Sequence, residues 1–151
     1  PFGFGIEIDK ETRKTLKKNI ISNSLTKKIK IITFEDFKSL KIKSKNKNFS
    51  KILVLIDIEG NEYNLLNKTN IKYFKNDFLI IELHQFISNS STKHNKFIQL
   101  LKKYYKIEEI KNSSRNPYLK EIEHLSDEER WMIVSEGRPC EMSWLICSPK
   151  Y

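Results

Sequence analysis

The sequence predicts an α/β protein built around a mainly parallel sheet. Segments of strand character alternate four times with segments of helical character. One strand segment, ILVLIDI at 52–58, is an uninterrupted apolar run, typical of a parallel strand covered on both faces. Acidic residues directly follow the apolar runs, at the edge of a parallel sheet where ligands bind. With 151 residues, of which 38% are hydrophobic, the chain is expected to form a single domain, 1–151.

Two β-α units are expected in the first third of the chain. The alternating segment FGFGIEI, residues 2–8, suits a strand, and Asp9 can cap a helix that continues to about Ile21. A second strand, KIKIITF at 28–34, leads into a turn or short helix. The lysine-rich stretch 41–50 that follows is expected to be an exposed linker.

The remaining two thirds are expected to continue the alternation and then change character. The expected elements are a strand at 52–58, a helix after Gly60, a strand at 77–84, a helix at 93–105, and a terminal pair of strands at 105–110 and 142–149. The last strand is the candidate for an antiparallel orientation. A long insert, 111–141, joins the terminal pair and is expected to hold a short helix.

Composition and charge narrow the class of protein. The net charge is +9, but only four of the 28 basic residues are arginine, and lysines spread among Asn and Ile indicate compositional bias. Nucleic acid is therefore the less favoured partner. No apolar run approaches the roughly 18 to 20 residues that a membrane span needs. Cys140 and Cys147 lack CxxC spacing, so a reducing, cytoplasmic setting is expected.

Candidate site residues follow the predicted strands. They are Glu7, Glu35, Asp36, Asp57, Glu59, Glu82 and His84. Structural roles compete with ligand binding: Asp9 is better explained as a helix cap, and Glu35 and Asp36 suit caps equally well. Glu62 lies in the first turn of a predicted helix, where an acid is favoured whatever the function. His84 comes two residues after Glu82, so both side chains project to the same face of an extended chain.

The residues around these acids resemble a known enzyme class. GIEIDKETRKTLKKNI is similar to the second strand and following helix of class I S-adenosylmethionine-dependent methyltransferases. TFEDF, LIDIEGNEYNLL and FLIIELH resemble, more narrowly, the FkbM-type methyltransferases, with their D-x-E-G-x-E run and a strand ending in an E-x-H-like motif. The resemblance covers roughly Gly5 to Phe86, although Leu55 stands where those enzymes often carry a lysine.

The resemblance implies a Rossmann-like class I methyltransferase fold, with S-adenosylmethionine as cofactor. Glu7 would hold the ribose hydroxyls of the cofactor, and Glu35, Asp36 and Asp57 would complete its binding site. Asp57 and His84 would deprotonate an acceptor hydroxyl, with Glu59 and Glu82 assisting. The expected reaction is O-methylation of a small molecule or glycan, selected by the insert 111–141 covering the acceptor pocket. No residue spacing dictates a metal site, so none is predicted, and a divalent ion is the minority alternative.

One part expected of this fold is not found in the sequence. Enzymes of this class carry an earlier strand and a glycine-rich loop for the methionine half of the cofactor, and Gly3 and Gly5 do not open a helix in the required way. We therefore expect a fold that is incomplete at its N-terminus and that binds the cofactor weakly or not at all by itself.

Three other functions remain open. An acid at a strand end would also suit a nucleotide-binding module that transfers no methyl group. The basic charge and the NPY at 116–118 suggest an RNA or DNA methyltransferase, although NPY lies far downstream of the expected motif position and is interpreted as a turn. An inactive interaction module that uses the basic surface is the third alternative.

Overall fold

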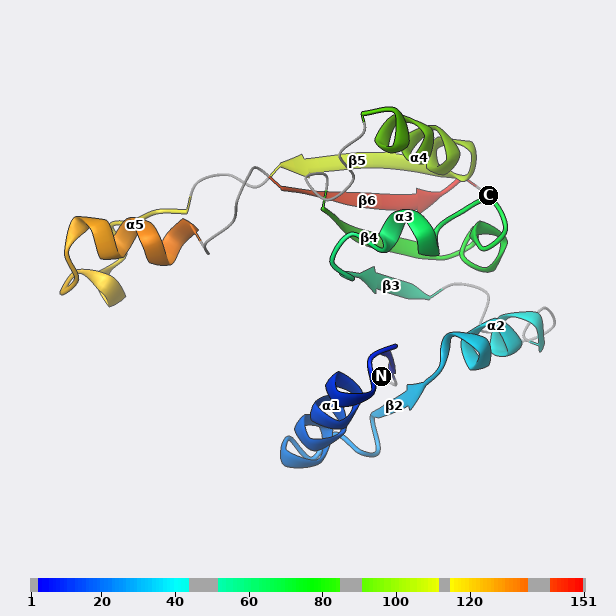
Figure 1. The fold of residues 1–151 in the computed structure, drawn as a ribbon, viewed down its shortest axis with the longest axis horizontal. Coiled ribbons are helices and arrows are strands. Elements are labelled where there is room, and N and C mark those ends of the chain that lie inside the picture. The colour runs from blue at the N-terminus through cyan, green and yellow to red at the C-terminus, as the bar shows by residue number, and fades with distance from the viewer. Residues whose placement is uncertain (1–2, 44–51, 85–90, 112–114, 136–141, 151) are drawn as a thin grey trace. The chain divides into compact units, whose positions relative to one another are not determined.

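The computed structural model describes residues 3–43, 52–84, 91–111, 115–135 and 142–150 (Figure 1). They fall into two compact units, Pro1–Ser50 and Lys51–Tyr151, and each is treated by itself. The expectation of one domain over 1–151 stays a prediction. Within the described residues, no helix combines the length and apolar character needed to cross a membrane.

The first unit is a parallel β-α-β unit followed by a helix. Strands β1 (Gly3–Ile6) and β2 (Ile29–Ile32) pair in parallel and are connected by α1 (Lys10–Ser22). A Cβ atom on Gly5 would lie only 3.1 Å from Cδ2 of Leu16, so the missing side chain lets α1 pack closely on β1.

Side-chain caps set the starts of both helices in this unit. Asp9 accepts the Thr12 N–H at 2.7 Å, as expected for a cap, and this bond lowers the pKa of the Asp9 carboxyl. Helix α2 (Phe34–Lys43) begins with reciprocal bonds: the Thr33 N–H donates to Asp36 Oδ2 at 3.0 Å, and the Asp36 N–H donates to Thr33 Oγ1 at 3.1 Å. The Thr33–Asp36 cap fixes the start of α2, which is longer than the turn or short helix that we expected.

A four-stranded sheet forms the centre of the second unit. The elements are β3 (Leu53–Ile56), α3 (Glu62–Leu65), a 3₁₀ turn (Ile71–Tyr73), β4 (Phe78–Leu83), α4 (Ser91–Tyr104), β5 (Tyr105–Lys111), a second 3₁₀ turn (Lys120–Ile122), α5 (Asp127–Ser135) and β6 (Ser143–Pro149). The strand order is β3-β4-β6-β5. The expected alternation of strands and helices and the terminal strand pair are thus confirmed.

The direction of β6 makes this sheet mixed. Strands β3 and β4 pair in parallel, but β6 runs antiparallel to both of its neighbours, β4 and β5. The antiparallel orientation expected of the last strand is thus confirmed, and the sheet is not clearly the mainly parallel one that the sequence predicts. The reason is the position of β6, which lies between two strands that share the opposite direction.

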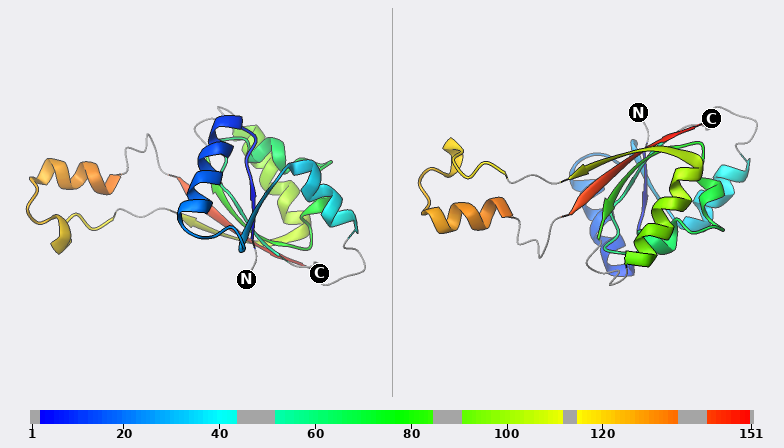
Figure 2. Two further views of the ribbon diagram at one scale, coloured as in Figure 1. Left: turned by 90° about the horizontal axis from the view of Figure 1, so that it is seen from below. Right: turned by 90° about the horizontal axis from the view of Figure 1, so that it is seen from above.

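One face of the four-stranded sheet carries the core of the second unit. Helices α3 and α4 cover this face (Figure 2), and the Tyr63 and Phe97 rings pack with centroids 4.8 Å apart. The β4 side chains that point to this face, Leu79, Ile81 and Leu83, are fully buried. These contacts hold β4, and with it the strand end that carries His84, in a fixed position.

Strand β3 differs from its prediction. The sequence predicts a strand covered on both faces, but the side chains of Leu53 and Leu55 are 67% and 64% exposed. Within the second unit β3 is the edge strand of its sheet, and the described helices α3 and α4 lie on the same face of that sheet, so neither of them covers the opposite face of β3.

Helix α3 is also shorter than the predicted helix after Gly60. Asn67 accepts the N–H groups of Thr69 and Asn70 at 2.8 and 2.9 Å, and its amide donates to the Asn64 carbonyl at 2.8 Å. These local bonds compete with helical hydrogen bonds and turn the chain after Leu65.

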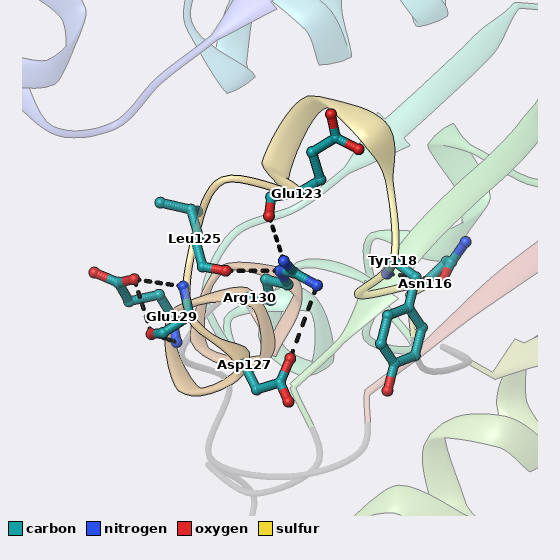
Figure 3. Close-up of polar contacts among 8 residues, drawn as sticks. Asn116, Tyr118, Glu123, Leu125, Asp127, Glu129 and Arg130 are labelled. Carbon is teal, nitrogen blue, oxygen red and sulfur yellow. Dashed lines mark hydrogen bonds and ion pairs between the residues drawn. The ribbon is translucent and has the colours of Figure 1, made fainter.

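The described part of the insert, 115–135, is held together by its own polar contacts (Figure 3). The Arg130 guanidinium donates to the carbonyls of Leu125 and Glu123 and lies 3.8 Å from Asp127. Glu129 accepts the Ser126 N–H at 2.8 Å, which caps α5 and lowers the pKa of Glu129. The predicted short helix is confirmed. The NPY segment forms the predicted turn, in which Asn116 Oδ1 accepts the Tyr118 N–H at 2.9 Å.

Candidate functional site

A tight turn after β3 presents the first carboxylates of the site. The Asn61 N–H donates to the Ile58 carbonyl at 3.1 Å, and the two residues between them, Glu59 and Gly60, have φ angles of 49° and 88°. Positive φ at both central positions is the pattern of a type I′ turn. Gly60 adopts this conformation without strain, as expected for a sharp turn, whereas Glu59 adopts it at a cost.

We expect the two central residues of this turn to respond oppositely to substitution. Gly60→Ala should lower the free energy of unfolding by about 1 to 2 kcal/mol, because it places a Cβ atom in the left-handed region. Glu59→Gly should leave it unchanged or raise it by up to about 1 kcal/mol, because it removes the same strain. Urea denaturation measures both. Equal losses in the two variants would mean that contacts of the Glu59 side chain, rather than its backbone strain, dominate its effect on stability.

His84 lies at the end of β4 and is almost completely buried, with 2% of its surface exposed. Its backbone N–H donates to Glu62 Oε1 at 2.9 Å. Glu62 begins α3 and is fully buried, so this bond ties the start of α3 to the end of β4. The sequence did not decide between a structural and a functional role for Glu62. The only sequence feature that pointed to Glu62 is its position two residues after Gly60.

The His84 ring lies among three carboxylates, and we call Asp57, Glu59, Glu62 and His84 the carboxylate–histidine cluster. Nε2 lies 3.3 Å from Glu59 Oε2 and 3.8 Å from Asp57 Oδ1, while Nδ1 lies 3.5 Å from Glu62 Oε1. The side chains of Asp57 and Glu59 are 46% and 82% exposed. The ring thus lies between one buried carboxylate and two that solvent or a ligand can reach.

The charges of this cluster are not balanced by nearby cations. Within the part of the chain that the structure describes, no lysine or arginine pairs with Asp57, Glu59 or Glu62. When the ring carries its proton on Nδ1, toward Glu62, the lone pair of Nε2 faces two carboxylate oxygens. That arrangement is favourable only when a proton, a hydroxyl donor or a cation lies between them. The cluster therefore suits an atom that is, or becomes, positively charged.

The other predicted catalytic residue, Glu82, is buried within β4, where it pairs with Trp144 of β6. Asp57, Glu59 and His84 each place one ligand-type atom within 4.8 Å of the other two. The structure thus brings together three of the four predicted catalytic residues. An assisting role for Glu82 stays a prediction.

Three of the predicted cofactor residues lie in the first unit. Glu7 follows β1 directly, where its Oε1 accepts the Asp9 N–H at 2.8 Å and its carbonyl accepts two N–H groups of Arg13 at 3.0 and 2.6 Å. Asp36 caps α2, and the bonds from Thr33 lower its pKa. Glu35 pairs with Lys38. Their cofactor contacts, and a shared sheet edge with Asp57, stay predictions.

The register of β6 places the ends of the insert beside the cluster. Ser143 pairs with Leu83 on one side and with Lys111 on the other. The insert therefore leaves and rejoins the sheet next to the strand end that carries His84. This position is the one that a segment selecting the acceptor would need.

Comparison with known proteins supports the fold. No protein-family model matches the sequence, and no curated protein matches it. Among solved structures, the chain is similar to a human methyltransferase 10 domain containing protein, with a TM-score of 0.55 and 14% identity. The match covers 99% of this chain and 61% of that one, so the chain spans less than two thirds of its structural neighbour. At this identity the likeness concerns the fold alone, and the chain has a methyltransferase-like α/β fold.

Proposed function

We propose that the protein is an S-adenosylmethionine-dependent methyltransferase of the FkbM type that methylates a hydroxyl of a small molecule or glycan. One observation carries the proposal: the buried His84 directs Nε2 toward the accessible carboxylates of Asp57 and Glu59. In a methyltransferase-like fold, this arrangement suits the removal of a proton from an acceptor hydroxyl.

The residues present fit the proposed cofactor through their chemistry. S-adenosylmethionine, when bound, supplies an electrophilic methyl group on a sulfonium sulfur. The Glu7 carboxylate follows a parallel strand, where an acid commonly accepts hydrogen bonds from ribose hydroxyls. Asp9 and Arg13 hold the side chain and the carbonyl of Glu7, so the carboxylate is positioned before any ligand binds. Glu35 and Asp36 of the same unit would contribute to the site, and a contribution of Asp57 stays a prediction.

The catalytic work of the chain is then to hold the acceptor oxygen and take its proton. Nε2 of His84 would take the hydroxyl proton as the acceptor oxygen is methylated. The Asp57 carboxylate, near the same nitrogen, stabilises the imidazolium that forms. Glu62 orients the ring by holding the His84 backbone N–H and facing Nδ1. General base catalysis of this kind contributes about a hundredfold to ten-thousandfold in rate.

The cofactor is tested by ligand binding. Saturation-transfer NMR and calorimetry should detect binding of S-adenosylmethionine and S-adenosylhomocysteine, even when the affinity is low. Glu7→Ala should weaken it by about 1 to 3 kcal/mol, because ribose hydroxyls lose a charged acceptor.

Glu11→Ala is the matched control, because Glu11 is an exposed acid on α1 whose carboxylate pairs with Lys14. Unchanged binding in Glu7→Ala would remove Glu7 from the site. Equal binding of ATP would favour a nucleotide-binding module without methyl transfer, and methylation of RNA in place of small hydroxyl acceptors would favour a nucleic acid methyltransferase.

A further inference from the structure

We propose that Asp57, Glu59 and His84 bind a divalent cation of the first transition series, Mn²⁺ or Zn²⁺, and that Glu62 orients the histidine ligand. The site offers two carboxylate oxygens and one imidazole nitrogen, which all lie within 4.8 Å of one another. Binding of the cation does not depend on the protein being a methyltransferase.

The distances within the cluster suit a shared ion. Ligand atoms about 2.1 Å from one metal ion lie about 3 to 3.5 Å from each other. Nε2 of His84 and Oε2 of Glu59 are 3.3 Å apart, within this range. Oδ1 of Asp57 lies 3.8 Å from Nε2, and a small rotation of this half-exposed side chain would bring it into range. The ring nitrogen is fixed by burial, so the exposed carboxylates make the adjustment.

The charge of the cluster also favours a cation. Asp57 and Glu59 bring two carboxylates to the same nitrogen, and the buried Glu62 places a third carboxylate behind the ring. Within the described residues no lysine or arginine compensates them. Like charges at such distances oppose one another, and a bound divalent ion removes that opposition.

Glu62 supplies an observation that is independent of the exposed acids. Its carboxylate is fully buried and faces Nδ1 of His84, and its Oε2 has no hydrogen-bond partner among the described residues. A metal-binding histidine characteristically turns its other ring nitrogen toward such a carboxylate, which fixes the tautomer and makes the ligand nitrogen more basic. Burying a carboxylate beside a buried imidazole costs free energy. A bound cation would offset this cost, whereas a site that contacts only water would not.

The kind of ion follows from the donor set. The imidazole nitrogen suits Zn²⁺ and the two carboxylates suit Mn²⁺, whereas Mg²⁺ and Ca²⁺ prefer sites made of oxygen alone. Three protein ligands leave coordination positions open for water or an acceptor hydroxyl. If the proposed function holds, the ion would acidify that hydroxyl in place of the free His84 ring.

Direct binding of metal salts to the full 151-residue chain tests the proposal without cofactor or acceptor. Free Mn²⁺ is measured by electron paramagnetic resonance and Zn²⁺ binding by calorimetry, with MgCl₂ in parallel. We expect one ion per chain. Asp57→Asn and Glu59→Gln should each weaken binding at least about tenfold, and Glu62→Gln about 10- to 100-fold through loss of the oriented ring.

Glu109→Gln removes an exposed acid on β5 and should leave the affinity unchanged. Melting temperatures show that each variant is folded, and the exposed positions of Asp57 and Glu59 keep the test independent of His84 packing. No Mn²⁺ or Zn²⁺ binding at millimolar concentration would overturn the proposal. Mg²⁺ binding as tight as that of Mn²⁺ would exclude the imidazole ligand, and equal affinities in all variants would place the ion elsewhere. Because no methyl transfer is measured, failure here leaves the proposed function standing.

Discussion

Asp57→Asn and His84→Ala should each lower the rate of methyl transfer by about a hundredfold to ten-thousandfold, the range for loss of a general base or its charged partner. Nε2 of His84 is the atom placed to take the acceptor proton, and Asp57 is the carboxylate that stabilises the charged ring. The rates are measured with isotopically labelled S-adenosylmethionine and a panel of hydroxyl acceptors. Each assay is run with and without Mn²⁺.

The melting temperatures of these variants distinguish a loss of catalysis from a loss of folding. The Asp57 side chain is 46% exposed, so Asp57→Asn should leave the melting temperature close to that of the native chain. His84 is buried, so His84→Ala should lower the melting temperature in addition to the rate of methyl transfer. Glu109→Gln should preserve both turnover and stability. Full turnover in Asp57→Asn would remove this carboxylate from the mechanism. Lost turnover together with a collapsed melting temperature in Asp57→Asn would indicate a structural role of the Asp57 carboxylate.

Glu62→Ala should lower the free energy of unfolding by about 2 to 4 kcal/mol, the largest stability effect that we expect in the cluster. The change removes the acceptor of a buried backbone N–H and leaves a cavity between α3 and the end of β4. Glu62→Gln keeps an acceptor of the same shape and should cost less than about 1 kcal/mol. Urea denaturation followed by circular dichroism measures the difference.

Glu109→Ala, an acid-to-alanine change at an exposed position, is the control for Glu62→Ala and should stay within about 0.5 kcal/mol of the native chain. Similar losses in Glu62→Ala and Glu62→Gln would mean that the negative charge, and not the hydrogen bond, stabilises this contact. That result would strengthen the case for a cation or a charged ring beside it.

The local elements of this protein could be predicted where short-range chemistry decides them. The capping residue Asp9 predicted the start of α1, and the residues from Ser143 to Pro149 predicted strand β6. The length of α3 could not be predicted from the sequence, because the side chain of Asn67 competes with the helix for backbone hydrogen-bonding groups. The spacing of hydrophobic residues does not reveal this competition.

The strand order was beyond sequence reasoning for a different reason. The pattern in β6 requires one buried face, with Leu145 and Cys147 pointing inward, and any pair of neighbouring strands satisfies it. Insertion between β4 and β5 depends on the fit of three strands together. The mixed sheet therefore follows from tertiary packing.

The candidate site was partly predictable. Asp57 and His84 follow apolar strands, and that position alone predicts that they lie at a ligand-binding edge. The contact between Glu62 and His84 joins positions 22 residues apart and depends on how α3 is set against β4. The left-handed backbone conformation of Glu59 was likewise not predicted from the sequence. The Glu-Gly pair after a strand indicates a turn but not the φ angle of its first residue.

The position of β6 has a consequence for synthesis of the protein. Among the described strands β6 is the last to leave the ribosome, yet it lies between β4 and β5 and joins them into one sheet. Until Ser143–Pro149 emerge, β4 exposes an unpaired edge and β5 has no neighbour among the described strands. The nascent second unit thus passes through an interval in which it is prone to aggregate and suited to chaperone binding, and insertion of one seven-residue strand ends that interval.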